Sequence, residues 1–169
     1  MKNKNLVIWV AVIVVFFGAL VLYSRSGSGG GTTATATGGG SGGSLVAAED
    51  SFDFGTVSMA AGKVSHVFKL KNESGAPVTI TKLYTSCMCT IASLNHGGKK
   101  LGPFGMPGHG LGAIPVISET INPGEEAEVE AVFDPAAHGP AGVGPIDRVV
   151  FVEQGDKSLQ LQFKAVVTP

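Results

Sequence analysis

The chain has 169 residues and a net charge of −1, and 44% of its residues are hydrophobic against 15% charged. The near-neutral charge lacks the basic surface of a nucleic-acid-binding protein, so no nucleic-acid partner is expected. The first 44 residues differ in composition from the remainder, which leaves about 125 residues, a suitable length for one domain.

An apolar segment at residues 6–23 is the first predicted element. Its 18 residues (LVIWVAVIVVFFGALVLY) carry no charge, which is close to the minimum length of a membrane-spanning helix. Trp9 and Tyr23 lie near its ends, where interfacial aromatic residues are favoured. Lys2 and Lys4 precede it, so the positive-inside rule predicts that residues 1–5 are cytoplasmic and that the chain after residue 23 lies outside.

A cleaved signal peptide is the alternative interpretation of this segment. The apolar run is longer than the usual signal core, and Leu22, Tyr23 and Ser24 form a poor cleavage site. An uncleaved single-pass anchor is therefore favoured, with the membrane as its partner. Both interpretations place the domain outside the cytoplasm.

Residues 24–44 (SRSGSGGGTTATATGGGSGGS) are predicted to form a flexible linker. The segment has no large apolar residue with which to pack a core. A Gly/Ser-rich chain of this length spans about 25 Å on average. It would let the domain move near the membrane surface.

Residues 45–169 are predicted to form an all-β domain, an antiparallel β-sandwich. Three segments alternate apolar and polar residues with period two, which is typical of strands with one buried face: they are residues 64–70, 126–133 and 159–167. Residues 149–152 form a short apolar run suited to a buried strand. Turn clusters such as Asn122-Pro123-Gly124 separate these segments, and none shows a helical period.

The pentapeptide Ser86-Cys87-Met88-Cys89-Thr90 contains the only two cysteines of the chain. A Gly/Pro-rich segment at about 91–120 follows and is predicted to be a loop insertion. It carries His96, Met106 and His109. Thiolate, thioether and imidazole are ligands that soft metal ions select.

The first hypothesis for these residues is a metal site. Cys87, Cys89, His96, Met106 and His109 are the candidate ligands, and Met88 and His66 are further candidates. Cu(I) is the favoured ion because it prefers sulfur ligands and accepts imidazole. Zn²⁺ is the alternative, although C-x-C is tighter than the usual zinc spacing.

The second hypothesis is that no cofactor is bound and that the two cysteines form a disulfide. An exported domain meets an oxidising compartment. A bridge between residues i and i+2 would need a turn and would be strained, and strained exposed bridges are the labile or catalytic ones. A thiol oxidoreductase is therefore a minor alternative, but the chain has no thioredoxin-like βαβ pattern, and no enzymatic activity is expected.

The order of motifs resembles a bacterial family of domains of unknown function. The motifs are Phe52-Asp53-Phe54-Gly55, His66-Val67-Phe68 through Asn72, Ser86 to Thr90, Ile121-Asn122-Pro123-Gly124-Glu125 and Phe133-Asp134. The resemblance implies an immunoglobulin-like sandwich akin to the abnormal-spindle/hydin type, without an established activity. Two departures stand out: Met88 replaces the usual Gly, and the segment at 91–120 is longer than usual.

The sequence thus predicts a single-pass protein of the bacterial cytoplasmic (inner) membrane, with its domain in the periplasm or at the cell surface. Its expected role is binding, in the sharper version the binding or handing on of Cu(I). The rival is a structural or assembly domain that binds a protein partner through a sheet edge or the 91–120 segment, with the cysteines as a brace.

Overall fold

The computed structural model describes residues 44–109 and 116–169. The predicted anchor at residues 6–23 and nearly all of the predicted linker lie outside these ranges. Within the described ranges, no helix is long and apolar enough to cross a membrane.

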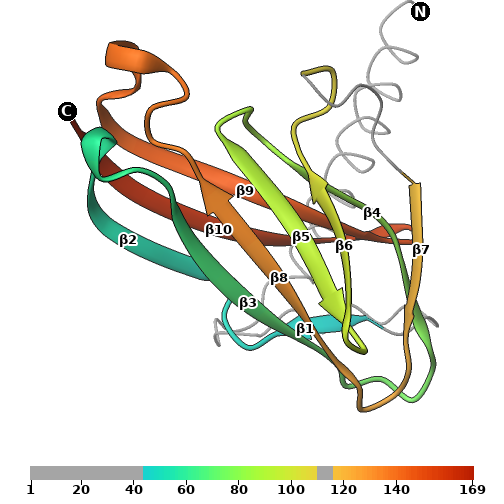
Figure 1. The fold of residues 1–169 in the computed structure, drawn as a ribbon. Helices are drawn as coiled ribbons and strands as arrows, with labels where there is room; N and C mark the ends of the chain where they lie inside the picture. The colour runs from blue at the N-terminus through green and yellow to red at the C-terminus, as the bar shows by residue number, and fades with distance from the viewer. Residues whose placement is uncertain (1–43, 110–115) are drawn as a thin grey trace, which may run out of the picture. The chain divides into compact units, whose positions relative to one another are not determined.

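The described chain forms two five-stranded sheets (Figure 1). The first sheet has the order β1 (Leu45–Ala47), β3 (Val64–Asn72), β8 (Glu126–Phe133), β5 (Thr90–His96) and β6 (Lys99–Phe104). The second has the order β2 (Ser51–Ser58), β10 (Lys157–Thr168), β9 (Gly144–Gln154), β4 (Val78–Thr85) and β7 (Val116–Ile121). Two short 3₁₀ helices, η1 (Met59–Ala61) and η2 (Gly139–Gly142), lie in connections. The all-β prediction is confirmed.

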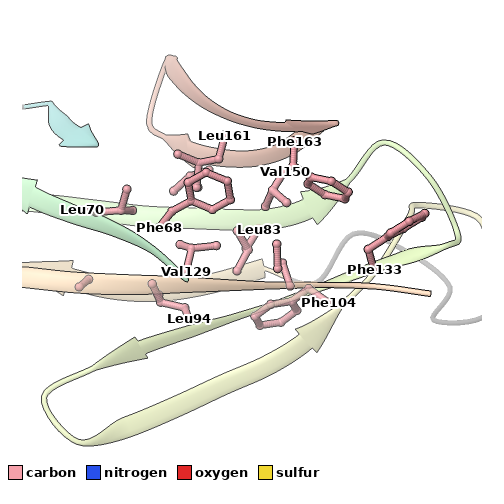
Figure 2. Packing of buried hydrophobic residues seen from close by; sticks show 14 of the residues in the cluster. Phe68, Leu70, Leu83, Leu94, Phe104, Val129, Phe133, Val150, Leu161 and Phe163 are labelled. Carbon is pink, nitrogen blue, oxygen red and sulfur yellow. The ribbon is translucent and has the colours of Figure 1, made fainter. Parts of the chain in front are cut away.

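Side chains from both sheets meet in one hydrophobic layer (Figure 2). Phe68 and Val129 come from the first sheet, and Leu161 and Phe163 from the second; each is at most 1% exposed. Burying a side chain of this size contributes about 1.5–3 kcal/mol. The period-two faces predicted for residues 64–70, 126–133 and 159–167 are the faces that the structure buries.

The segment at 91–120 is not the single loop that the sequence predicts. It contains most of β5, all of β6 and nearly all of β7. Gly97 and Gly98 form the two-residue turn between β5 and β6, with φ of +57° and +77°. Two-residue hairpin turns with two positive φ angles favour glycine, so this Gly-Gly pair is a hairpin signal. Some glycines of this segment therefore belong to tight turns between strands rather than to a long loop.

Two connections that cross from one sheet to the other lie at the same end of the sandwich (Figure 1). The first, residues 86–89, joins β4 to β5. The second, residues 134–143, joins β8 to β9 and includes η2. The backbone N–H of Asp134 donates to the carbonyl of Cys89 over 2.8 Å, which ties the two connections together.

Candidate functional site

The cysteine-containing connection is a tight turn held by its neighbours. The Thr90 N–H donates to the Cys87 carbonyl over 3.1 Å. The hydroxyl of Thr85, which is 1% exposed, lies 3.0 Å from the carbonyls of both Cys87 and Thr90. The Ser86 N–H donates to the Val149 carbonyl, and the Ser86 hydroxyl accepts from the Val149 N–H, each over 2.9 Å. These bonds fix the turn against β9.

The turn brings the two thiol sulfurs together. The Sγ atoms of Cys87 and Cys89 are 2.6 Å apart, and both residues are free cysteines. Cys89 is buried at 2% exposure, whereas Cys87 is half-buried. Met88, between them, is 51% exposed. The sulfurs therefore converge at the end of the core while the intervening side chain reaches solvent.

His138, on the second connection, completes a three-residue group. Its Nε2 atom is 3.2 Å from the Sγ atom of Cys87. The Cys87 and Cys89 sulfurs and a ring nitrogen of His138 all lie within 4.8 Å of one another, and they form a group that could hold a metal ion. Cys87 and Cys89 come from the β4–β5 connection and His138 from the β8–β9 connection.

Arg148 on β9 supplies a positive charge to the site. Its Nε–H donates to the Sγ atom of Cys89 over 3.3 Å, and its Nη1 donates to the carbonyl of Asp147 over 2.7 Å. Arg148 is half-buried. Burial works to lower the pKa of Arg148, but its interactions with the two cysteines outweigh burial and raise the pKa. Arg148 therefore stays charged beside the sulfurs.

The two thiols have opposite pKa shifts. Burial works to raise the pKa of Cys87, but hydrogen bonds from the Cys89 thiol, the Cys89 N–H and His138, together with the charge of Arg148, lower it to about 7. Burial and the hydrogen bond to Cys87 raise the pKa of Cys89. Because one thiol donates to the other, the first proton to leave comes from Cys87. With its pKa at about 7, the Cys87 thiol is about half deprotonated at neutral pH, and the negative charge lies mainly on this more exposed sulfur.

His96 and His66, two of the predicted candidates, lie in ion-pair geometry with glutamates. The Nδ1 atom of His96 is 2.8 Å from Glu119, and its Nε2 atom is 3.4 Å from Glu125. His96 is the last residue of β5, so it lies about 20 Å along the strand from the cysteine turn. His66 is 2.8 Å from Glu49 and stacks on the ring of Phe52. Neither histidine belongs to a described metal-type group.

Met106 and His109 follow β6 at the cysteine end of the sandwich. The Thr85 N–H donates to the carbonyl of Gly105 over 3.3 Å, so the chain enters this segment beside the cysteine turn. The His109 N–H donates to the Met106 carbonyl. Within residues 44–109 and 116–169, no described hydrogen bond joins either side chain to a sulfur. Their predicted role as ligands stays a prediction.

His138 and Arg148 are the site residues that the sequence analysis does not select. His138 reads as a solvated loop residue, and Arg148 carries no motif. A usable signal is the position of His138 five residues after Phe133, which pairs with Thr90 across β8 and β5. That register places the residues after Phe133 beside the cysteine turn. It becomes visible only when the strand pairing is known.

Comparisons with known proteins support the fold and the likeness to a family of unknown function. Residues 45–102, which include both cysteines, match the family described as "Protein of unknown function (DUF1573)". No curated protein matches the sequence.

Among solved structures, a protein of unknown function from Porphyromonas gingivalis W83 has a TM-score of 0.54 and 13% identity, over 73% of this chain and 46% of that chain. This chain thus spans about half the length of that protein, and the likeness supports the fold alone. The ASH/PapD-like domain 7 of human CEP192 has a TM-score of 0.44 and 12% identity, over 83% of this chain and 96% of that chain. The periplasmic chaperone SfaE has a TM-score of 0.37 and 9% identity, over 75% and 58%.

Proposed function

We propose that this protein is a membrane-tethered, extracytoplasmic binding module that holds a soft metal ion, Cu(I), through Cys87, Cys89 and His138. The observation that carries the proposal is the convergence of two thiols and an imidazole within 4.8 Å at one end of the sandwich. Sulfur and imidazole donors suit Cu(I).

The charge and number of the donors favour Cu(I) over Zn²⁺. Structural zinc sites are almost always four-coordinate, and the described group offers three ligands. Two thiolates and one Cu⁺ carry a net charge of −1, which the guanidinium of the half-buried Arg148 offsets. With Zn²⁺ the same ligands would be neutral and the charge of Arg148 would stand uncompensated, which is costly for a partly buried group. Zn²⁺ remains the comparison ion.

Met106 and His109 are proposed to gate access to the site rather than to add a permanent fourth ligand. Their segment begins beside Thr85, at the same end as the cysteines. His96, at the other end of β5, supplies a matched control histidine.

The setting of the module is also proposed. The apolar segment at 6–23 would anchor it in a bacterial cytoplasmic membrane, the linker at 24–44 would tether it, and an immunoglobulin-like sandwich outside would carry the site. Binding would be the role of this module.

A competitive titration tests the metal site. The full chain, purified in detergent and reduced under anaerobic conditions, is titrated with Cu(I) and separately with Zn²⁺ against a chromophoric chelator. One Cu(I) per chain is expected, with Zn²⁺ bound far more weakly. Cys87→Ser or Cys89→Ser should lower Cu(I) affinity at least a hundredfold, and His138→Ala at least tenfold.

Two control variants sharpen this titration. His96→Ala should leave Cu(I) affinity unchanged, and His109→Ala tests whether the loop contributes. Wild-type protein that retains no Cu(I), or His96→Ala weakening binding as much as His138→Ala, would overturn the proposal.

A protein-binding or assembly role is the second candidate. It is favoured by β7, an edge strand of the second sheet whose Val116 is 79% exposed. An edge strand presents unpaired backbone groups that can pair with an extended partner segment. In that case Val116→Lys would reduce partner capture, whereas the cysteine variants would not.

A further inference from the structure

We propose that Cys87 and Cys89 are also a thiol–disulfide exchange pair, in which Cys87 reacts with an incoming disulfide and Cys89 resolves the mixed disulfide. The reduced pair would deliver two electrons to a small-molecule or protein disulfide. This activity uses the same two sulfurs as the proposed metal site but does not depend on metal binding.

The difference in exposure between the two sulfurs assigns their roles. Cys87 is half-buried at the end of the sandwich, next to the exposed Met88 and the exposed His138. Cys89 is 2% exposed and counts among the buried core residues. Thiol–disulfide exchange needs a sulfur that an external disulfide can approach. Only Cys87 meets that requirement.

The position of Cys89 suits the second step. Its sulfur lies 2.6 Å from that of Cys87, and Cys89 is the more buried of the two residues. A resolving thiol must reach the attacking sulfur without unfolding the chain, and here the turn already holds the two side by side. The hydrogen bonds of Thr85 to the carbonyls of Cys87 and Thr90 keep that turn closed.

The polar neighbours complement both steps. His138 lies 3.2 Å from the sulfur of Cys87, and Arg148 donates to the sulfur of Cys89 over 3.3 Å. Each sulfur therefore has its own partner able to stabilise developing negative charge, which is the microenvironment of reactive cysteines.

The chemistry balances as two exchanges. The Cys87 sulfur attacks a disulfide RS–SR, a Cys87–SR bond forms, the RS–SR bond breaks, and one RSH leaves. The Cys89 sulfur then attacks the Cys87 sulfur, the Cys87–Cys89 bond forms, the Cys87–SR bond breaks, and the second RSH leaves. The two cysteines are oxidised, RS–SR is reduced, and both thiol protons end on the two RSH molecules.

The test uses the reduced full chain in detergent, freed of metal by a chelator, with oxidised glutathione as the disulfide. Wild-type protein should lose the mass of two hydrogens and accumulate no adduct. Cys89→Ser should accumulate one glutathione adduct on Cys87. Cys87→Ser should react at least tenfold more slowly. Rapid acid quenching of the wild type should find the first adduct on Cys87.

A denatured control separates the effect of the fold from that of chemistry. In urea the two single variants should react at equal rates, since both then expose one cysteine. Equal rates in the native state, a first adduct on Cys89, or stable adducts on the wild type would overturn the proposal. Disulfide exchange without Cu(I) binding would overturn the proposed function and leave this inference intact. Cu(I) binding without disulfide exchange would overturn this inference and leave the proposed function intact.

Discussion

At the scale of single residues, the pKa of Cys87 predicts a pH dependence. Its value of about 7 lies below the usual thiol range because donors and a positive charge surround it. Raising the pH through 7 deprotonates the thiol, so alkylation by iodoacetamide should rise with a midpoint near pH 7. His138→Ala removes one donor and should move the midpoint upward. Mass spectrometry of the first alkylation follows this, and an unchanged midpoint would contradict the assignment.

Substitution of Asn72 is predicted to lower the stability of the protein. Its buried side chain donates to the carbonyls of Ala76 over 2.9 Å and Ile121 over 2.8 Å, and it accepts from the Ser74 N–H. Asn72→Ala would remove this donor from the buried carbonyl of Ile121, at a cost of about 1–3 kcal/mol, whereas the exposed carbonyl of Ala76 keeps the Ser74 hydroxyl as a donor. Urea unfolding measures the change. Asn95→Ala, at a half-buried position, should cost less than about 0.5 kcal/mol.

At the scale of elements, the β5–β6 hairpin depends on its two glycines. A side chain at positive φ costs roughly 1–2 kcal/mol, so Gly98→Ala should destabilise the protein by about that amount. Gly97→Asn should be nearly neutral because Asn tolerates this conformation. Gly75→Ala is the matched control: its φ is not positive and its Cβ would meet nothing. Thermal unfolding ranks the three variants, and equal losses would contradict the turn assignment.

The strands that the sequence predicts are those whose two faces differ. On β3, β8 and β10, alternation follows directly from burial on one side. On β5 the pattern is interrupted, since the polar Ser93 is buried between Ala92 and Leu94. On β9, Val150 and Val152 are buried whereas Val149 and Phe151 are half-buried, and Phe151 stacks on Tyr84. Because Val149 and Phe151 are apolar, the sequence predicts that they are buried like Val150 and Val152. The structure buries them only in part.

The candidate site likewise has a part that the sequence predicts and a part that it does not. Only Met88 separates Cys87 from Cys89 in the sequence, so their convergence could be predicted from one turn. His138 lies 51 residues from Cys87, and its approach depends on the pairing of β8 with β5. Arg148 depends in turn on the position of β9. The local sequence pattern cannot predict the contacts of His138 and Arg148 with the cysteines, because both contacts depend on the pairing of strands that are far apart in the chain.

At the scale of the whole molecule, Phe163 predicts how strongly the two sheets depend on each other. Its ring on β10 contacts Phe133 of the first sheet and Phe54 of β2, with centroids 5.7 and 5.4 Å apart. Phe163→Ala should cost about 3–5 kcal/mol. Gln162→Ala, the exposed neighbour on β10, should cost less than about 0.5 kcal/mol. Urea unfolding of both variants checks this, and similar losses would contradict the two-layer core.

The two inter-sheet connections at the cysteine end have a consequence for local motion. A metal ion held by Cys87, Cys89 and His138 would fasten one connection to the other, so amide exchange in residues 86–90 and 134–143 should slow when the ion binds. The opposite end, where His96 lies between Glu119 and Glu125, would exchange at an unchanged rate. Each molecule thus contains its own reference, and occupancy of the site can be read as a ratio of exchange rates between its two ends.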